Sequence, residues 1–504
     1  MAGMLEKWIR FPDSRSDYIL ACMKILTHTL PIARAARVAA LLLLLAAGIM
    51  SARAISPVAA ARGATEASLP GRWMYTPPMV QELPPDDAWW RGFGDSMLDS
   101  LIRAAQERNY DVAIALKRIE LARRGVQSAR AGYFPTIDLA AGYTASRTSG
   151  AMTKHVGPAI HSNYMNVGAQ ATWEPDVFGR ITARVREAKA GVSVSRADYA
   201  ATMVSICSEV AEAYIQLRMY QAQLQLMEEH LKSQERVLNI VKARHEAGLV
   251  SGLDEAQAQT VFGSTKAQIP PLKMSVAASV NTIATLLGMY PADIADMLTP
   301  VRELPRYSAP VRTMMPAEML RRRPDIVEAE RTLAQEAAAL GVSKKEFMPR
   351  LSIQGSVGYA AHDAGELFKG HSLVYSVAPT LSWTLFDGFG RRAAVESARS
   401  QMEIASAQYE QTVLAAVTDV ENALNAYINA TELVDELRDV VTSAGTFFSE
   451  ALEQYRSGLT NFTPVADAEI SLLQYAYSLI QACGQRMSSL ISLYKAQGGG
   501  IDIE

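Results

Sequence analysis

Apolar residues recur every three or four positions between Arg391 and Ser457, a stretch with no proline and with Gly445 as its only glycine. The repeating positions are Val395, Ala398, Met402, Ala405, Tyr409, Val413, Ala416, Val420, Ala423 and Tyr427. This spacing puts them on one face of a single α-helix. At 1.5 Å per residue the helix is about 100 Å long, so it is predicted to pack along other long helices.

A second stretch of the same kind runs from Arg180 to Ala247, again without proline and with Gly191 as its only glycine. Both stretches end at the same dipeptide, Gly248-Leu249 in one case and Gly458-Leu459 in the other. Glycine followed by a hydrophobic residue is typical of a helix C-terminus. A return helix of about 35 residues is predicted after the first turn, with Pro270-Pro271 bending it.

The apolar period changes to two in four shorter segments, which predicts β-strands. In the first of them Ile137, Leu139 and Tyr143 alternate with small or polar residues. The predicted strands cover about 136–146, 164–174, 351–361 and 373–385. They form two hairpins, each directly before one of the long helices.

The order of elements therefore occurs twice: helix, hairpin, long helix, turn, return helix. Tyr133-Phe134-Pro135 matches Phe347-Met348-Pro349, and later landmarks repeat with offsets of 211 and 210 residues. An internal duplication is predicted. Repeat 1 covers 95–290, with its long helix at 180–247, and repeat 2 covers 316–498, with its long helix at 391–457. Residues 291–315 are a linker and 499–504 a C-terminal tail.

This layout places the hairpins at one end of a rod and the two helical turns at the other. Strands of about 10–12 residues with alternating faces suit a tilted transmembrane β-strand. Four strands cannot close a barrel, and open edges are not tolerated in lipid, so several copies would have to share one. Two copies would give a filled barrel, and three a barrel with a lumen. The alternative is a soluble antiparallel coiled coil with small hairpins.

The N-terminus has the layout of a secretory signal peptide. A basic region from Met23 is followed by an apolar run from Val38 to Met50 and by Ala52-Arg53-Ala54. Cleavage is predicted after Ala54, so that 1–54 is a misassigned start plus a signal peptide, and 55–94 is read as an extended arm. No later segment has about 18 consecutive apolar residues, so no transmembrane helix is predicted.

Composition excludes several functions. The chain has 504 residues, 49% hydrophobic and 20% charged, with a net charge of −3 and no basic cluster for nucleic acid. It has no phosphate loop and no nucleophile–base constellation, so an enzyme is not expected, and no cofactor is implied. Four histidines lie in the two predicted hairpin loops and are interpreted as solvated side chains, not as a metal site: His155, His161, His362 and His371. Helix positions place Cys207 and Cys483 about 24 Å apart, so both are predicted to be unpaired.

The sequence resembles TolC-like outer-membrane channels, in particular the NodT/OprM-type outer-membrane factors of efflux pumps, over about 85–504. Matching motifs are Trp89-Trp90, Trp173 to Arg180, Arg322-Arg323-Pro324-Asp325-Ile326 and Trp383 to Gly388. The resemblance implies a mostly α-helical fold with a membrane β-barrel: a homotrimer with an α-helical tunnel and a shared barrel of twelve strands. It also implies a periplasmic adaptor and an inner-membrane RND-type transporter as partners. A lipobox cysteine is absent after Gly48-Ile49-Met50-Ser51, so a lipid anchor is not expected.

The same resemblance suggests a gate at the two turns. Asp254 and Tyr455 match a pair that holds neighbouring coils together, and Asp467 matches an aspartate that rings the pore. Thr460 and Pro464 replace an arginine and a second aspartate of the family pattern. Closure is therefore expected to depend more on packing, at Leu459 or Phe462. Alternatively, both aspartates simply favour helix N-termini.

Gly248, Leu249, Gly458 and Leu459 are expected to contact the adaptor, although glycine caps would explain them equally well. The predicted function is an outer-membrane exit channel for small toxic compounds in a tripartite efflux system. One alternative is an exit duct for type I protein secretion. Another, of a different class, is a structural periplasmic coiled-coil protein.

Overall fold

The computed structural model describes residues 57–74, 80–82, 88–149 and 160–499. All of them belong to one unit, Pro57–Glu504. The predicted signal peptide with its cleavage site after Ala54 lies outside the described residues, as does His155. No helix in the described part of the chain is long and apolar enough to cross a membrane.

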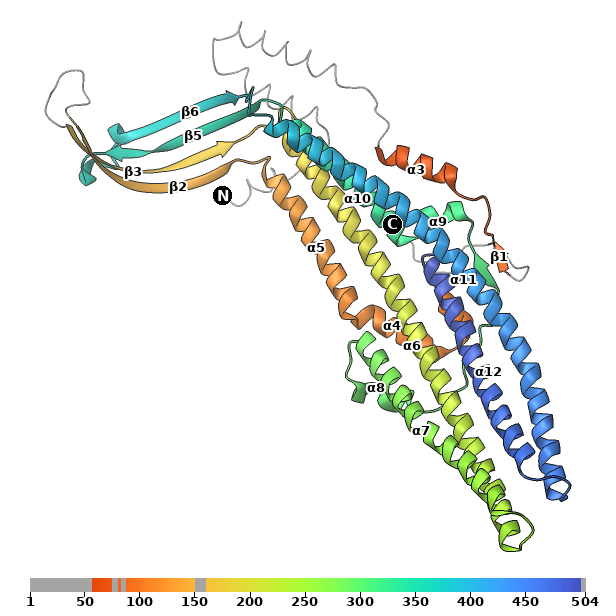
Figure 1. The fold of residues 1–504 in the computed structure, drawn as a ribbon. Coiled ribbons are helices and arrows are strands. Elements are labelled where there is room, and N and C mark those ends of the chain that lie inside the picture. The colour runs from red at the N-terminus through yellow and green to blue at the C-terminus, as the bar shows by residue number, and fades with distance from the viewer. Residues whose placement is uncertain (1–56, 75–79, 83–87, 150–159, 500–504) are drawn as a thin grey trace. The chain divides into compact units, whose positions relative to one another are not determined.

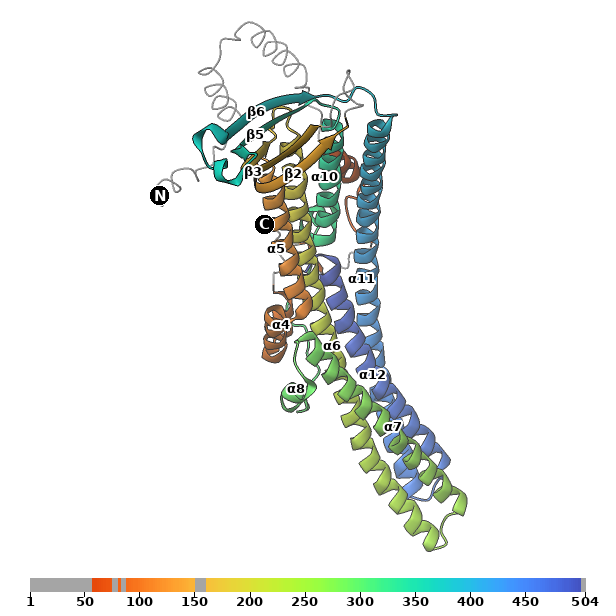
Figure 2. The same cartoon turned by 90° about the vertical axis from the view of Figure 1, so that its left-hand side faces the viewer.

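Two helices of 67 residues dominate this unit, α6 (Arg180–Glu246) and α11 (Gly390–Arg456). Each turns back into a return helix, α7 (Gly252–Leu286) or α12 (Thr463–Ala496). The two turns lie at the end of the unit opposite the sheet, as Figures 1 and 2 show. The apolar stripe of α11 is buried along much of its length, at Ala405, Tyr409, Val413, Ala416, Val420 and Ala423. The predicted unit of helix, hairpin, long helix and return helix is confirmed, including its duplication.

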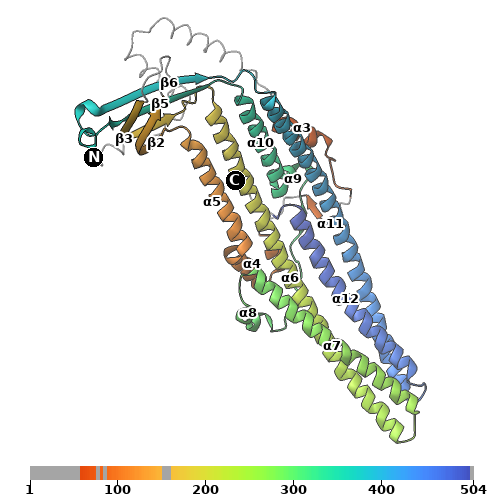
Figure 3. The same ribbon diagram turned by 60° about the vertical axis from the view of Figure 1, so that its left-hand side comes forward.

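Shorter helices precede the hairpins. In repeat 1 these are α4 (Ser96–Arg108) and α5 (Tyr110–Ala131), and in repeat 2 α9 (Pro316–Arg322) and α10 (Pro324–Lys345). Helix α8 (Pro291–Leu298) lies in the segment predicted as a linker. Helices α5 and α10 pack beside the upper half of α6, which is visible in Figure 3.

The N-terminal arm is not extended throughout, and that prediction was wrong. Residues Pro57–Ser68 form helix α3, because the stretch is rich in alanine and begins with proline, which suits the first helical position. Further on, β1 (Val80–Glu82) pairs in parallel with β4 (Val311–Thr313). The short helix η3 (Trp89–Phe93) is buried, with Trp89 stacked on Tyr494 at 5.3 Å between ring centroids.

The sheet has four antiparallel strands in the order β2-β3-β5-β6. Their bounds are Thr136–Thr148, Ile160–Trp173, Arg350–Ala361 and Leu373–Ser382. Strand β6 ends three residues before the predicted boundary at 385. There the indole Nε1 of Trp383 donates a hydrogen bond to the carbonyl of Phe347 (3.0 Å), and the chain turns toward α11.

The strand register gives the sheet one apolar and one polar face. Leu139 lies opposite Ala169, Val167 opposite Tyr359, and Val357 opposite Tyr375. The positions between them carry polar or small residues, including Asn166, Gln170, Gln354 and Ser376. Of the large apolar side chains, Leu139, Val357 and Tyr375 are nevertheless exposed in the single chain, whereas Val167 and Tyr359 are partly covered. The sheet therefore presents a continuous apolar surface that its own chain leaves uncovered.

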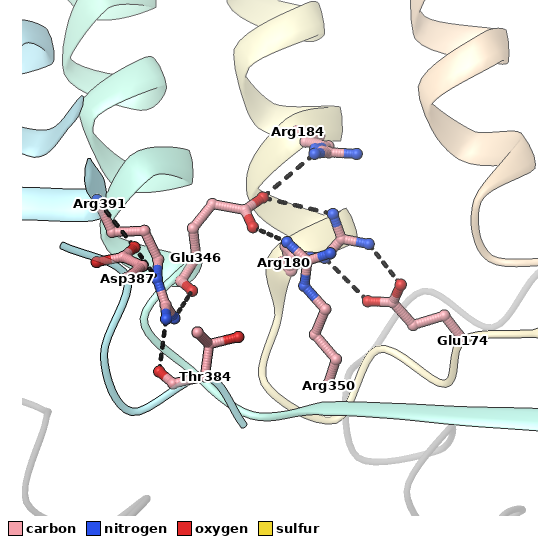
Figure 4. A network of polar contacts seen from close by, with 8 residues as sticks. All are labelled: Glu174, Arg180, Arg184, Glu346, Arg350, Thr384, Asp387 and Arg391. Atoms are coloured by element: carbon pink, nitrogen blue, oxygen red, sulfur yellow. Dashed lines mark hydrogen bonds and ion pairs between the residues drawn. The ribbon is translucent and has the colours of Figure 1, made fainter. Parts of the chain in front are cut away.

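An ionic network joins the sheet to the helices (Figure 4). The carboxylate of Glu346, just after α10, pairs with Arg180, Arg184 and Arg350. Arg180 also forms a pair with Glu174 in which two of its nitrogens donate, at 2.5 and 2.9 Å. We call these five residues the junction network. Since Arg180 belongs to repeat 1 and Glu346 to repeat 2, the network connects the two repeats.

The histidines and cysteines in the described part of the chain form no evident site. His161 lies within β3 and not in a hairpin loop. The ring Nδ1 of His362 is hydrogen-bonded to the carbonyl of Asn163, and the Nε2 of His371 lies 3.0 Å from Oε2 of Glu366. The described residues contain no group of three or more potential metal ligands. Cys207 and Cys483 are free thiols. Burial raises the pKa of Cys207 to about 11, partly offset by a hydrogen bond from Gln106.

Candidate functional site: the two helical turns

Both long helices end in the same backbone motif. Gly248 (φ 69°) and Gly458 (φ 75°) adopt the left-handed conformation. The next amide in each turn reaches back into the helix, from Leu249 to the carbonyl of Arg244 and from Leu459 to that of Gln454, both at 2.9 Å. These bonds form a Schellman cap, which glycine permits because it has no Cβ atom. The cap fixes the shape of each turn.

The leucine after each glycine points into solvent. Leu249 is 69% exposed and Leu459 is 79% exposed. In a Schellman cap a residue at this position commonly makes a hydrophobic contact with its own helix. Here both side chains are instead available for another surface. Leu459, which was expected to close the gate by packing, has no such packing within this chain.

Tyr455 occupies the centre of the contact between the two turns. Its ring is 1% exposed and packs edge to face on Phe462, with centroids 5.5 Å apart. Burial raises the pKa of the Tyr455 hydroxyl, and the nearby charge of Asp254 raises it further, while Arg244 lowers it. Phe462 is equally buried, so its ring packs against residues of its own chain.

The predicted pairing of Asp254 with Tyr455 is only partly present. Asp254 is buried in the first turn of α7 and lies close enough for its charge to act on Tyr455. Its Oδ1, however, accepts a hydrogen bond from Ser251 Oγ (3.4 Å). The buried hydroxyl of Tyr455 has no hydrogen-bond partner within the described residues. The two side chains are brought together without a direct bond.

Arg244 makes contacts between the two turns that the sequence analysis did not predict. From the last turn of α6, its Nη1 donates to the carbonyls of Tyr455 (2.8 Å) and Arg456 (3.1 Å) at the end of α11. Its guanidinium also lies over the ring of Tyr455, 4.9 Å from the centroid. A cation is favourable at a helix C-terminus, where carbonyls lack partners. Arg244 thus ties the first turn to the second.

Two carboxylates near the start of α12 have opposite environments. Asp467 is exposed, and its backbone carbonyl accepts a hydrogen bond from Ser471. Glu469 is 2% exposed, and its Oε1 has no partner. Burial raises the pKa of Glu469 to about 7. Sequence analysis singled out Asp467 and overlooked Glu469, because burial cannot be read from a carboxylate's position alone.

The turns are held together by one apolar cluster to which all four helices contribute. Its members are Val237, Leu238, Val241, Ala258, Val261, Ala451, Tyr455, Phe462, Val465, Ala466 and Ala468. A polar contact, Thr463 Oγ1 to Gln257 Oε1 at 3.4 Å, also joins the starts of α12 and α7. The site therefore combines a packed interior, which joins the two helical hairpins, with an exposed rim.

Comparison with known proteins agrees with this architecture. The sequence model described as outer membrane efflux protein matches residues 101–289 and 315–499, most of both repeats. Nodulation protein T of Rhizobium leguminosarum bv. trifolii is 29% identical over 413 residues, which cover 82% of this chain and 88% of that protein. The solvent efflux pump outer membrane protein SrpC of Pseudomonas putida is 30% identical over 409 residues, covering 81% and 86%.

Solved structures give the same picture. The outer-membrane channel OprN superposes with a TM-score of 0.79 at 28% identity, over 86% of this chain and 97% of that one. The open state of the MtrE outer membrane channel of Neisseria gonorrhoeae gives a TM-score of 0.73 at 25% identity, over 87% and 97%. With both repeats matched by the family model, this chain belongs to the outer membrane efflux protein family.

Proposed function

We propose that this protein is the outer-membrane exit channel of a tripartite efflux system. The observation that carries the proposal is the sheet, whose apolar face is exposed and whose outer strands β2 and β6 each pair on one side only among the described residues. Unpaired strand edges are not tolerated in lipid. Three copies would join their sheets into a closed barrel of twelve strands, wide enough for a lumen.

The helices would continue this barrel as a tunnel into the periplasm. Helices of 67 residues are about 100 Å long. The proposed gate lies at their far end, at Asp254, Tyr455, Leu459, Phe462 and Asp467. In the closed state Arg244, Tyr455 and the apolar cluster hold the two turns together. Opening would separate the hairpins, and the exposed Asp467 of three copies would attract cations to the pore.

The exposed rim suggests the partners. Leu249 and Leu459 are apolar groups at the tips of both turns, as a docking site for a periplasmic adaptor requires. An inner-membrane RND-type transporter would then supply the energy. Relatives named for solvent and antibiotic efflux favour small toxic compounds as the transported solutes. The predicted signal peptide would deliver the chain to the outer membrane of a Gram-negative bacterium.

Membrane fractionation and planar-bilayer recordings test the channel. We expect the protein in the outer-membrane fraction, and ion conductance from the purified protein in a lipid bilayer. Recovery in the soluble periplasmic fraction, together with no conductance, would leave the structural coiled-coil alternative as the better explanation. Conductance without any effect of gene deletion on solvent or antibiotic sensitivity would argue for a different cargo.

Docking at the tips is tested separately. The double variant Leu249→Asp and Leu459→Asp should still assemble and conduct, but should fail to restore solvent tolerance to a deletion strain. Met274→Asp is a matched control, since Met274 is equally exposed on α7 but distant in sequence from the turn. If the tip variant restores tolerance as well as the control does, the tips are not the docking site.

A further inference from the structure

A cavity of about 510 Å³ lies where helix α12 ends and helix α10 begins. Helices α6 and α11 form its other walls. Its charged lining residues are Arg323, Asp325, Asp419 and Lys495, and alanines such as Ala426 form much of the rest. Pockets of this volume commonly hold small organic molecules. The cavity therefore has the size and the mixed lining of a binding site for such a molecule.

Arg323 holds two carboxylates in place at the wall of the cavity. Its side chain is buried, and its Nη1 donates to the carbonyls of Ala416 (3.2 Å) and Ala496 (2.9 Å), which fixes it to α11 and to the end of α12. Its Nε and Nη2 donate to Asp325, and Nη2 also donates to Asp419 (2.7 Å). The side chains of Asp325 and Asp419 nevertheless remain 41% and 53% exposed. Each carboxylate is thus oriented by Arg323 and still has surface open to a ligand.

Lys495 brings the opposite charge to the same cavity. It lies in the last turn of α12, is exposed, and forms no ion pair with another residue in the described part of the chain. Lys495 and Asp419 therefore border one space without neutralising each other. A molecule with an ammonium group and a carboxylate would complement both charges through charge-assisted hydrogen bonds.

The cavity faces away from the N-terminal arm. The carboxylate of Glu421 accepts a hydrogen bond from the backbone amide of Met74 (2.7 Å), so this side of α11 faces the arm. Asp419 precedes Glu421 by two residues, which is about 200° around a helix. On α12, Ser492 stands in the same relation to Tyr494, whose ring stacks on η3. The cavity therefore lies on the side of both helices opposite to the arm and η3.

Polar side chains continue along this side of the molecule toward the two turns. Ser205 at the cavity donates to Glu209 (3.1 Å), one turn further along α6. Another turn on, Glu212 accepts a hydrogen bond from Ser488 of α12 (2.7 Å). The wall of a water-filled tunnel has to be polar in this way, because water must hydrate it. In the proposed channel this side would line the tunnel, and a passing solute would meet the cavity.

We propose that this cavity binds a small zwitterionic solute, with its ammonium group on Asp419 and Asp325 and its carboxylate on Lys495. The inference rests on the proposed channel function and adds to it a solute-binding site in the tunnel wall of each chain. The alanine surface, including Ala426, contacts the apolar part of the solute. Because both charges contribute, a solute with only one of them should bind more weakly.

Fluorescence titration with three matched probes tests the charge requirement on the purified full-length protein. Nα-dansyl-lysine has an ammonium group and a carboxylate, dansylcadaverine has only the ammonium group, and Nα-dansyl-norleucine has only the carboxylate. Dansyl-lysine should bind about tenfold more tightly than either of the others, since each charged hydrogen bond contributes about that factor. Asp419→Asn should abolish its advantage over dansyl-norleucine, and Lys495→Gln its advantage over dansylcadaverine.

Three further variants serve as controls. Asp439→Asn and Lys232→Gln remove exposed charges about 30 Å from the cavity along α11 and about 40 Å from it along α6, and should bind like the wild type. Ala426→Phe fills the cavity without changing a charge, so it should weaken the binding of all three probes. Since Ala426 is exposed, this variant also tests the cavity without disturbing the ion pair of Arg323 with Asp419.

Planar-bilayer recordings separate the cavity from the channel. Dansyl-lysine should lower the conductance of the wild type, and lower it less in the Asp419 and Lys495 variants. A conducting protein that binds dansyl-lysine no better than the single-charge probes would overturn the cavity site and leave the channel standing. Selective binding without any effect on conductance would overturn the place of the site in the tunnel wall. A wild type that does not conduct would overturn the channel, whatever the probes bind.

Discussion

At the scale of single residues, the turns are distinguished by two polar groups near their apolar cluster, one partly buried and one fully buried. Arg244 and Glu469 are both examples, and neither is marked by its position in the sequence pattern. Arg244 finds partners in the open carbonyls of α11, whereas the Oε1 of Glu469 has no hydrogen-bond partner among the described residues. Buried polar groups without partners are costly. The stability of the contact between the two turns should therefore depend on the charge of Glu469 and on the hydrogen bonds of Arg244.

Glu469 makes the packing of the turns sensitive to pH. Its pKa is about 7 in the folded chain and near 4.5 when exposed, so the folded state holds the proton more tightly. As the pH rises from about 4.5 to about 7, the free energy of unfolding of the turns should fall by about 3 kcal/mol in total. Above pH 7 it should level off. Hydrogen exchange in residues 448–470 should accelerate from pH 5 to pH 8 beyond its intrinsic pH dependence.

The variant Glu469→Gln should lose most of this excess acceleration and exchange more slowly than the wild type at pH 8. Asp467→Asn is the control, because Asp467 is exposed two residues away and should behave like the wild type. A wild-type protein with no excess acceleration would show that Glu469 is not held neutral by burial.

Arg244 is expected to keep the gate closed. Arg244→Gln would lose the charge and the contact with the Tyr455 ring. The interaction between the first and the second turn should therefore weaken by about 1.5–3 kcal/mol. In planar bilayers the variant should therefore conduct more in its resting state than the wild type. Arg456→Gln is a matched control, since Arg456 is exposed and makes only a surface pair with Glu453. Equal resting conductance of the two variants would contradict the role of Arg244.

At the scale of elements, the hydrophobic period predicted the helices and strands well, because the long helix α11 and the strands each carry their large apolar residues on one face. The strand register then follows the same alternation, as the facing of Val167 and Tyr359 illustrates. The pattern failed where local propensity decided the outcome. Helix α3 forms in the supposedly extended arm because its sequence is rich in alanine, which favours helix.

The glycines of the two turns and Gly445 within α11 should respond oppositely to substitution. Gly248→Ala and Gly458→Ala should each destabilise the turns by about 1 kcal/mol, since both residues have positive φ. Gly445→Ala in α11 should instead stabilise the helix by about 0.5–1 kcal/mol, because its Cβ meets no atom within 4 Å. Thermal unfolding of the three variants compares these effects directly. A stabilised Gly458→Ala variant would show that the cap conformation is not required.

At the scale of the whole molecule, one chain contains every element of the proposed channel but closes none of it. The sheet has an uncovered apolar face and two strand edges open to further pairing, and the helical turns present exposed leucines. The junction network fixes the sheet on the helices within a chain. Assembly would complete surfaces that the single chain leaves open.

Asp467 should influence ion passage through the assembled channel. Its exposed carboxylate, repeated in three copies, would attract cations, so Asp467→Asn should lower the preference of the open channel for cations over anions. Reversal potentials in a salt gradient measure this preference. Asp439→Asn, which removes an exposed carboxylate from the middle of α11, is the control. An equal change in both variants would mean that Asp467 does not ring the pore.

The sequence by itself determined the duplication, the long helices, the two-faced strands and the glycine-ended turns. Each of these depends on residue period or on the backbone preference of one residue type, and such properties are local. Only the tertiary structure decided which polar groups lie inside. Arg244 meets Tyr455 across 211 residues, Glu346 gathers arginines from two repeats, and Glu469 is only 2% exposed. Burial and charge pairing arise from segments distant in sequence, so no local pattern could specify them.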